Sequence, residues 1–253
     1  MRTQARCLLL AVPFVAACTD ITTNKTAVLS IQFDSPTFPS VAVGDTLRDS
    51  TGAVIHPHVT AYNFQGDLIE SPNVRFSTPD RGITVDSITG IVFGDSLRST
   101  AARVIATVGQ LQAQQPVLLS LRPDLIVATN ATDTIAWSLL DTAVNVTATG
   151  VSVHLIHRNG ADSTVPNWIV SFKIVSTTNA AAVELVSDNG KASIVDTTDA
   201  SGVALRKLKL HASLLGASAT TDSVVINATA KYHGAVVSGS PVRLVVRYKP
   251  RSP

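Results

Sequence analysis

The chain has 253 residues with 20 basic and 18 acidic side chains, and hydrophobic residues make up 45% of it. Charged residues are 15% and aromatic residues 5%, while Val, Thr, Ser, Ala and Leu dominate. This composition is typical of a β-rich chain that can bury a core, and it excludes a disordered protein. The near-balance of charge, with no run of like charges, removes the electrostatic case for nucleic acid or an anionic membrane surface.

The N-terminus has the parts of a secretory signal. Arg2 and Arg6 precede a short apolar run, Leu8–Cys18, which is too short to span a bilayer. The run ends in Val-Ala-Ala-Cys, which resembles a bacterial lipobox. That resemblance implies cleavage before Cys18 and acylation of the new N-terminal cysteine, and two or three acyl chains anchor a protein stably. We expect a signal peptide at 1–17 and a lipidated tether at 18–26.

Cysteine usage agrees with this interpretation, although an ordinary signal peptide with an incidental cysteine is the alternative. The only cysteines are Cys7, inside the signal, and Cys18. The mature chain would then have no disulfide and would depend on its core for stability. Removal of Arg2 and Arg6 leaves 20 − 2 = 18 basic against 18 acidic residues. By resemblance to proteobacterial sorting, Thr19 after the cysteine implies the outer membrane, on its periplasmic or surface face.

Short alternating segments separated by turn residues begin at Ala27. Many such strands at close intervals predict an all-β sandwich. Residues 103–115 also suit one face of a helix, but Gly109 in the middle favours strand–turn–strand. The segments predicted as strands in the first half are 28–33, 41–43, 54–63, 74–76, 83–85, 91–93 and 102–108.

The turn and core positions of this half resemble the bacterial Ig-like group 2 domain over residues 27–121. Phe76 stands where that family has a strand tryptophan. The resemblance implies an Ig-like sandwich and nothing about activity. The motifs that carry it are Val41–Leu47, Asn63–Asp67, Val85–Val92 and Ala102–Gly109.

Leu121–Asp124 is the predicted boundary, because proline and polar residues there separate two runs of strands. Residues 205–215 also fit a helix, but we favour a strand with a bend near Lys207. The second half resembles the group 1, invasin/intimin-type Ig-like domain, which implies a second sandwich at 122–249 and a loose tail at 250–253. The motifs that carry this resemblance are Asp199–Leu205, Ala228–Ala230, the turn at His233-Gly234 and Ser238–Val242.

The sequence contains only a weak match to a catalytic motif. Gly94–Leu97 spells the Gly-Asp-Ser-Leu string of a hydrolase family, which would make Ser96 a nucleophile. It sits between two predicted strands, no downstream Asp-x-x-His supplies a base, and Gly44–Leu47 shows that Gly-Asp with a hydroxyl residue is a favoured turn here. We expect no catalytic residue.

Metal ligands are equally sparse. His56 and His58 share one strand face, but a zinc site needs three or four ligands, and His154 and His157 are similarly incomplete. Asp188–Gly190 and the segment Asp196–Gly202 do not have EF-hand spacing and are expected to be hairpin turns. We expect no metal and no cofactor.

Four aromatic residues could form a patch for sugar stacking or protein docking, or could be core and rim residues. They are Tyr62, Phe64, Trp137 and Trp168.

The sequence therefore predicts an all-β protein with two tandem Ig-like β-sandwich domains after an N-terminal signal helix and a short tether. The function we expect is non-enzymatic: a lipid-anchored envelope protein whose domains act as spacer, scaffold or adhesive module. Its partners would be the membrane, through the lipid on Cys18, and an envelope or host protein or polysaccharide, with no nucleic acid. The alternatives are a carbohydrate- or polymer-binding accessory module and, remotely, a serine hydrolase using Ser96.

Overall fold

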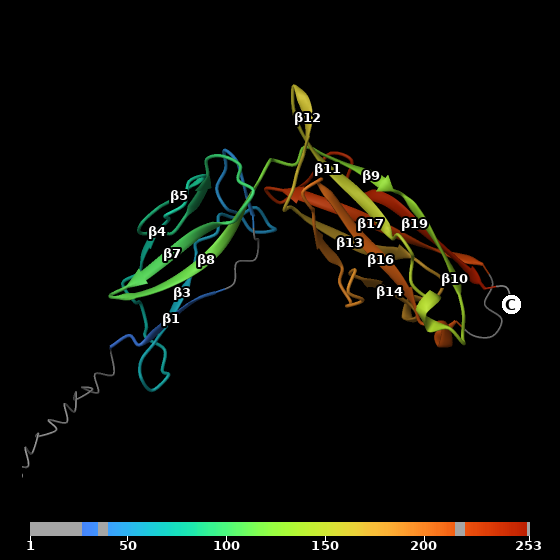
Figure 1. Cartoon of the computed structure of the whole chain (residues 1–253), viewed down its shortest axis with the longest axis horizontal. Helices are drawn as coiled ribbons and strands as arrows, with labels where there is room; N and C mark the ends of the chain where they lie inside the picture. Colours follow the sequence, from blue (N-terminus) through green and yellow to red (C-terminus); the bar gives the residue numbers. More distant parts are fainter. Residues whose placement is uncertain (1–26, 35–39, 216–220, 252–253) are drawn as a thin grey trace, which may run out of the picture.

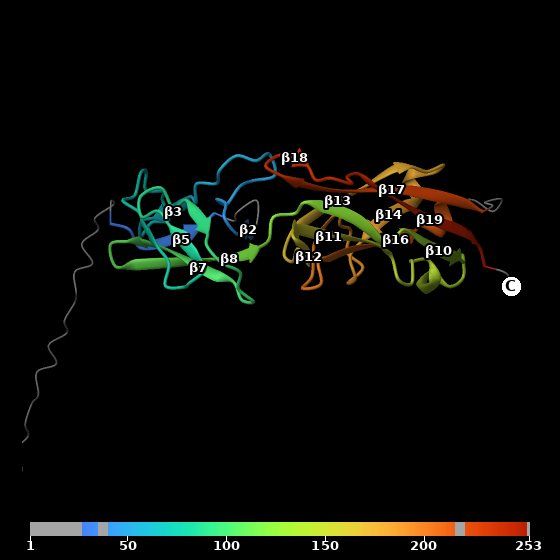
Figure 2. The same cartoon turned by 90° about the horizontal axis from the view of Figure 1, so that it is seen from above.

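The computed structural model describes residues 27–34, 40–215 and 221–251, and it confirms the all-β class. Two Ig-like β-sandwich domains lie end to end (Figures 1 and 2). The expected signal helix, the tether and Cys18 lie outside the described residues. Helical structure in the described ranges is confined to single 3-10 turns, η1 (Thr142–Val144), η2 (Ala180–Ala182) and η3 (Ala212–Leu214). Within those ranges, no helix has the length and apolar character needed to cross a membrane.

The first domain contains strands β1 to β8. Its larger sheet has the order β2-β8-β7-β4, in which β2 runs parallel to β8 and the other pairs are antiparallel. The antiparallel pairs β1–β3 and β5–β6 complete the domain. The bounds are β1 (Ser30–Phe33), β2 (Ser40–Ala42), β3 (Val59–Tyr62), β4 (Arg75–Ser77), β5 (Ile83–Val85), β6 (Val92–Gly94), β7 (Ala102–Val108) and β8 (Leu111–Ser120).

The second domain packs two sheets face to face, the arrangement of an Ig-like sandwich. One sheet has the order β10-β19-β17-β13-β15, with β18 beside β17, and the other has the order β12-β11-β16-β14, with β9 beside β11. The bounds are β9 (Leu125–Asn130), β10 (Thr132–Trp137), β11 (Val151–Asn159), β12 (Ala161–Thr164), β13 (Ile169–Ser176), β14 (Val183–Val186), β15 (Val195–Thr197), β16 (Val203–Leu210), β17 (Asp222–Tyr232), β18 (Ala235–Val236) and β19 (Val242–Pro250).

Strict alternation along the long strands builds the core of the second domain. In β17 and β19 every second side chain is buried and the ones between face outward, as the two-residue period of a strand requires. Burying one such apolar side chain contributes about 1.5–3 kcal/mol. The buried members are Val224, Ile226, Ala228 and Ala230 of β17 and Leu244, Val246 and Tyr248 of β19.

Several local predictions are confirmed and others are wrong. Gly109, with φ of +60°, forms the tight turn between β7 and β8, and Phe76 is buried in the core as expected. The predicted strand 54–63 is shorter, because only Val59–Tyr62 pairs regularly after Pro57, which has no N–H to donate. The bend predicted near Lys207 is absent: β16 is continuous, and the chain turns only after it ends, at η3.

Candidate functional site at the domain junction

The two domains meet where a loop of the first, residues 43–54, docks on the His233-Gly234 turn between β17 and β18 (Figure 2). Gly234 has φ of +77°, and a Cβ added there would lie 2.1 Å from the carbonyl oxygen of Thr51. Gly52 has φ of +94°, and its added Cβ would lie 2.4 Å from the carbonyl carbon of His233. Only glycine allows two backbones to approach this closely at positive φ.

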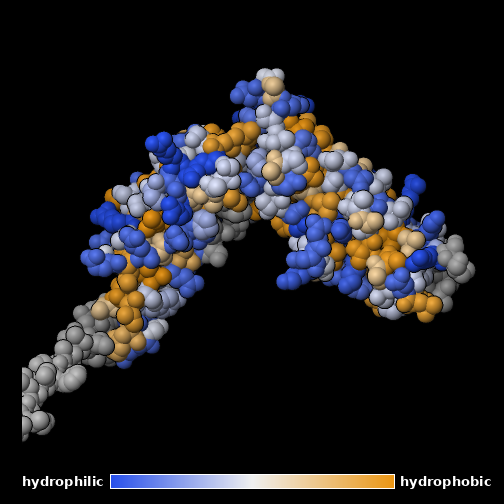
Figure 3. Space-filling model, in the orientation of Figure 1, coloured by the Kyte–Doolittle hydropathy of each residue, from blue (hydrophilic) through white to orange (hydrophobic). Residues whose placement is uncertain are grey.

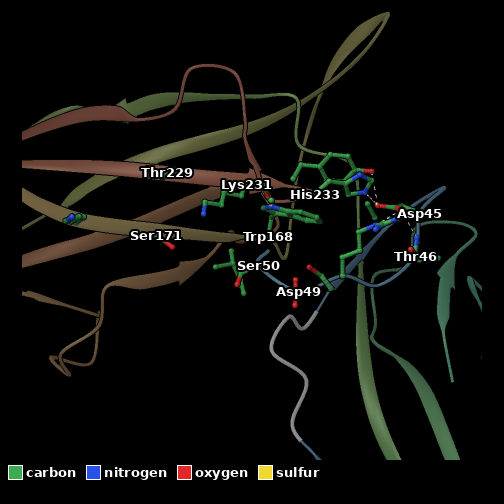
Figure 4. A pocket seen from close by; sticks show the side chains of 16 residues that line it. Asp45, Thr46, Asp49, Ser50, Trp168, Ser171, Thr229, Lys231 and His233 are labelled. Atoms are coloured by element: carbon green, nitrogen blue, oxygen red, sulfur yellow. Dashed lines mark hydrogen bonds and ion pairs between the residues drawn. The ribbon is translucent and has the colours of Figure 1, made fainter. Parts of the chain in front are cut away.

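Asp45 is at the centre of this junction (Figure 4). Its Oδ2 atom accepts a hydrogen bond from the Tyr232 hydroxyl at 2.9 Å and also contacts Nε2 of His233. Its Oδ1 atom accepts from the Thr46 N–H at 2.8 Å and from Nε of Arg48 at 3.3 Å. One carboxylate of the first domain is therefore bonded by two side chains of the second, and its side chain is only 13% exposed.

The electrostatics of this cluster favour an ionised Asp45. Burial by itself would raise the pKa of Asp45, but the hydrogen bonds from His233, the Thr46 N–H and Tyr232 outweigh it and lower the pKa below its ordinary value. Burial, together with the hydrogen bond to the Asp45 carboxylate, raises the pKa of Tyr232 to about 12. Tyr232 therefore remains a hydrogen-bond donor across the whole physiological pH range.

Aromatic rings continue the junction into the second domain. Tyr232 stacks on the His233 ring with centroids 4.0 Å apart, and its centroid lies 6.0 Å from that of Trp168. The Trp168 indole N–H donates to the Lys231 carbonyl oxygen at 3.1 Å. A cavity of about 290 Å³ lies beside these rings and is closed from the other side by residues that include Asp49 (Figure 4).

A second contact fixes the chain where it passes between the domains. The Ser120 hydroxyl, at the end of β8, donates to the Pro166 carbonyl oxygen at 2.5 Å. After it, Asp124 accepts from Nε of Arg122 at 2.8 Å and contacts Nδ1 of His157 at 2.7 Å. Ile55 packs against the cores of both domains. The junction thus combines apolar contact, a buried carboxylate and a linker held at both ends.

Asp45 and His233 are a carboxylate and a histidine in contact, which are two of the three residues of a nucleophilic triad. Within the described part of the chain, no Ser, Thr or Cys side chain is hydrogen-bonded to the other ring nitrogen of His233. The geometry therefore joins the two domains and activates no nucleophile among these residues.

Ser96 lies in the exposed loop after β6, as predicted for a turn. The backbone N–H of this loop residue donates to the Gly82 carbonyl oxygen at 3.3 Å. Among the described residues no histidine is hydrogen-bonded to the Ser96 hydroxyl, so the base that a serine nucleophile needs is not in place there.

The four histidines considered as metal ligands differ in their surroundings. His58 is exposed, but its Nδ1 atom lies 2.6 Å from Oδ2 of Asp34, a partner that sequence spacing did not indicate. His154 and His157 are partly buried. In the described ranges, no group of three or more His, Cys, Asp or Glu side chains is placed to hold a metal ion.

The acidic turns form as predicted. Asp199 accepts from the Ser201 and Val203 N–H groups at 2.8 and 3.0 Å, and Gly202 has φ of +76°. Asp196 instead pairs with the buried Arg206, with Nη1 and Oδ1 2.9 Å apart. Asp199 thus closes its own turn, whereas Asp196 of β15 bonds to Arg206 of β16 in the other sheet.

The aromatic patch is contradicted. Trp137 and Trp168 are each only 5% exposed and belong to the core of the second domain. A stacking platform requires an accessible ring face, so neither indole can serve as one. Phe64 is exposed at the turn after β3, but neither tryptophan is exposed to form a patch with it.

No protein-family model matches the chain, and no curated protein sequence matches it. Among solved structures, domains 5–6 of the S-layer protein SbsC align with 89% of this chain and 99% of theirs, at 15% identity and a TM-score of 0.30. Human protocadherin-24 EC1-2 aligns with 90% and 100%, at 13% identity and a TM-score of 0.28. A glycosyl hydrolase family 2 member from Bacteroides cellulosilyticus aligns with 76% and 23%, at 9% identity and a TM-score of 0.28. Likenesses this distant carry no argument about function.

Proposed function

We propose that this chain is a non-enzymatic, lipid-anchored envelope protein whose two Ig-like domains form a stiff spacer. The first domain would be of the bacterial group 2 type and the second of the group 1, invasin/intimin type. The spacer would hold the loops at its far end away from an outer membrane to which Cys18 is attached. The observation that carries the proposal is the junction: a spacer transmits position only if its domains do not swing freely.

Contacts at the junction support stiffness. Domains in one chain move relative to each other by default unless a substantial interface joins them. Here the 43–54 loop meets the His233-Gly234 turn backbone to backbone, and Asp45 receives two bonds from across the interface. The far end of the second domain, around η1 and η3, is left facing outward (Figure 1).

The stiffness is tested by replacing Gly234 with valine. A Cβ there collides with the Thr51 carbonyl oxygen, so we expect the loop to undock and the domains to move. Gly66→Val is the matched control, because Gly66 has a similar φ of +83° but nothing within 4 Å of an added Cβ. Both variants place a side chain at positive φ, which costs about 1–2 kcal/mol of backbone strain. Only the side chain at position 234 collides with the other domain.

The measurement is the distance distribution between spin labels, by double electron–electron resonance. The labels are placed on exposed cysteines introduced at Gln112 and Lys191, one in each domain, with Cys7 and Cys18 replaced by serine. We expect a narrow distribution for the parent chain and for Gly66→Val, and a broad one for Gly234→Val. A broad distribution in the parent would overturn the stiff spacer.

The anchor is tested separately by Cys18→Ser in the otherwise native chain. We expect the lipid-derived mass to disappear and the protein to move from the membrane fraction to the soluble fraction, because acyl chains supply the attachment. Fractionation and intact mass spectrometry measure both effects. Unchanged mass and membrane attachment would show that the chain carries no lipid at this residue.

A further inference from the structure

The outward face of one sheet in the second domain carries charge of a single sign. The strands are β13, β17 and β19, which lie side by side. On each, the residues between the buried ones point away from the core, and the charged residues among these are all cations. They are Lys173, Lys231, Arg243, Arg247 and Lys249, and all are exposed.

Carboxylates near these cations are bonded to other groups of the protein. Asp222 of β17 is bonded to the hydroxyl of the buried Tyr248, at 3.1 Å. At the junction end of the face, Asp49 accepts from the N–H groups of its own loop, Thr51 and Ala53. A chain whose charges nearly cancel overall therefore concentrates cations on this face.

These cations have no protein partner. Among the described residues, none of the five side chains takes part in an ion pair or a side-chain hydrogen bond. Most of the other exposed arginines do have one: Arg103 lies 2.9 Å from Asp80, and Arg122 lies 2.8 Å from Asp124. Arg75, Arg81 and Lys191 are also exposed and without an ion pair, but they lie outside this sheet face, where five unpaired cations occur together and are free to meet an external anion.

Strand register places the cations in a line. Lys173 and Arg243 lie on either side of Asn227, because both pair with it across the sheet. Lys231 lies four residues beyond Asn227 along β17, and Lys249 lies six residues beyond Arg243 in the opposite direction. At about 3.3 Å per residue the stripe is roughly 33 Å long, and with strands about 4.8 Å apart it is far narrower than that.

We infer that this basic stripe is a docking surface for a linear anionic polysaccharide. Charge complementarity identifies the partner: a long, narrow band of unpaired cations, three strands wide, fits an extended chain that carries anionic groups along its length. Arginine guanidinium groups bind carboxylate or sulfate in a bidentate manner. The positions between the cations include Asn227, Thr229 and Ser171, whose amide and hydroxyl groups can exchange hydrogen bonds with sugar hydroxyls.

Two other polyanions fit less well. A membrane-binding face adds Trp, Phe or Leu that inserts between lipids, and no outward position of the three strands carries one. Single-stranded nucleic acid is held by aromatic rings on which bases stack, and the nearby Trp168 is buried. On the face of the molecule that Figure 3 displays, apolar surface lies in several separate patches. The inference does not depend on the lipid anchor.

The test is affinity gel electrophoresis of the full-length chain, with Cys18→Ser as background so that no acyl group contributes. The gels contain polygalacturonate, heparin or, as the neutral comparison, dextran. The variant is Arg243→Glu with Arg247→Glu. Its matched control, Arg75→Glu with Lys191→Glu, makes the same charge change at exposed positions outside the stripe. Circular dichroism verifies that each variant is folded.

We expect retardation by polygalacturonate or heparin and none by dextran. The stripe variant should bind about tenfold more weakly or worse, the control should bind like the parent, and added salt should weaken binding because counterions are released. Equal loss in both variants would mean that net charge alone is responsible, and the inference would fail. It would also fail if neither polysaccharide retards the chain, or if the chain binds phosphatidylglycerol vesicles or oligothymidylate more tightly than either of them.

Discussion

Trp168→Ala should lower the free energy of unfolding by about 3–5 kcal/mol, the range for removing a large buried aromatic side chain. The indole is 5% exposed, packs in the core of the second domain and lies beside Tyr232 at the junction. Its loss opens a cavity and also leaves the Lys231 carbonyl oxygen without its donor. Urea unfolding followed by circular dichroism measures the change.

Trp137 supplies the matched comparison, because it is buried to the same degree in the same core. The two indoles differ in their polar contacts: Nε1 of Trp137 is buried and has no hydrogen-bond partner among the described residues. Both phenylalanine variants lose packing, and Trp168→Phe should lose about 1 kcal/mol more than Trp137→Phe, because only the Trp168 indole N–H donates to a carbonyl oxygen. If the two phenylalanine variants behave alike, the Trp168 hydrogen bond does not contribute to stability.

The fold was predictable where local signals were strong. Alternation of apolar and polar residues identified β7 with the bounds 102–108, and glycine marked the turn at Gly109. The strand β10 was missed, because its six residues contain Thr and Asp at outer and end positions and show only a weak period. It forms by pairing in parallel with β19, more than a hundred residues later, so its stability comes from a partner that local pattern does not reveal.

The junction was not predictable for a related reason. Asp45 and His233 were each recognised as part of a turn, and turn chemistry explains both positions without any contact between them. They meet across 188 residues only because two separately folded sandwiches are held at one angle. For Trp137 and Trp168, the residue type alone was compatible with an exposed or a buried side chain. Their positions at the end of β10 and just before β13 place both side chains in the core.

Net charge alone did not reveal the basic stripe. A balanced total removed the electrostatic case for nucleic acid or an anionic membrane surface, but the total does not report where charges lie. In a strand, side chains two apart share a face, so Lys173, Arg243 and Arg247 reach the same surface while carboxylates such as Asp222 and Asp196 are bonded within the domain. The stripe depends on the order of strands in the sheet, which local sequence does not reveal.

Asp45→Asn should loosen the junction at neutral pH. The amide keeps the shape of the side chain but removes the charge that strengthens the bonds from Tyr232, His233 and Arg48, and hydrogen bonds to a charged group contribute about 1.5–3 kcal/mol each. The distance distribution between labelled domains should broaden. Asp49→Asn is the control, because Asp49 lies in the same loop but its side chain bonds to Thr51 and Ala53 of that loop.

The same carboxylate predicts how the junction responds to acid. The folded-state pKa of Asp45 lies below its ordinary value of 3.8, so its contribution is complete above pH 3.8 and is lost as the pH falls through the folded-state pKa. The domains should therefore separate in acid in the parent chain, and Asp45→Asn should remove that dependence.

Global stability is a poor readout, because Asp80, Asp124 and Asp199 also have lowered pKa values and weaken the fold in acid. The distance between domains is therefore measured while circular dichroism still shows folded strands, and the difference between the parent chain and Asp45→Asn separates Asp45 from Asp124, which lies at the linker. If this distance does not change with acidification in the parent chain, Asp45 does not hold the domains together.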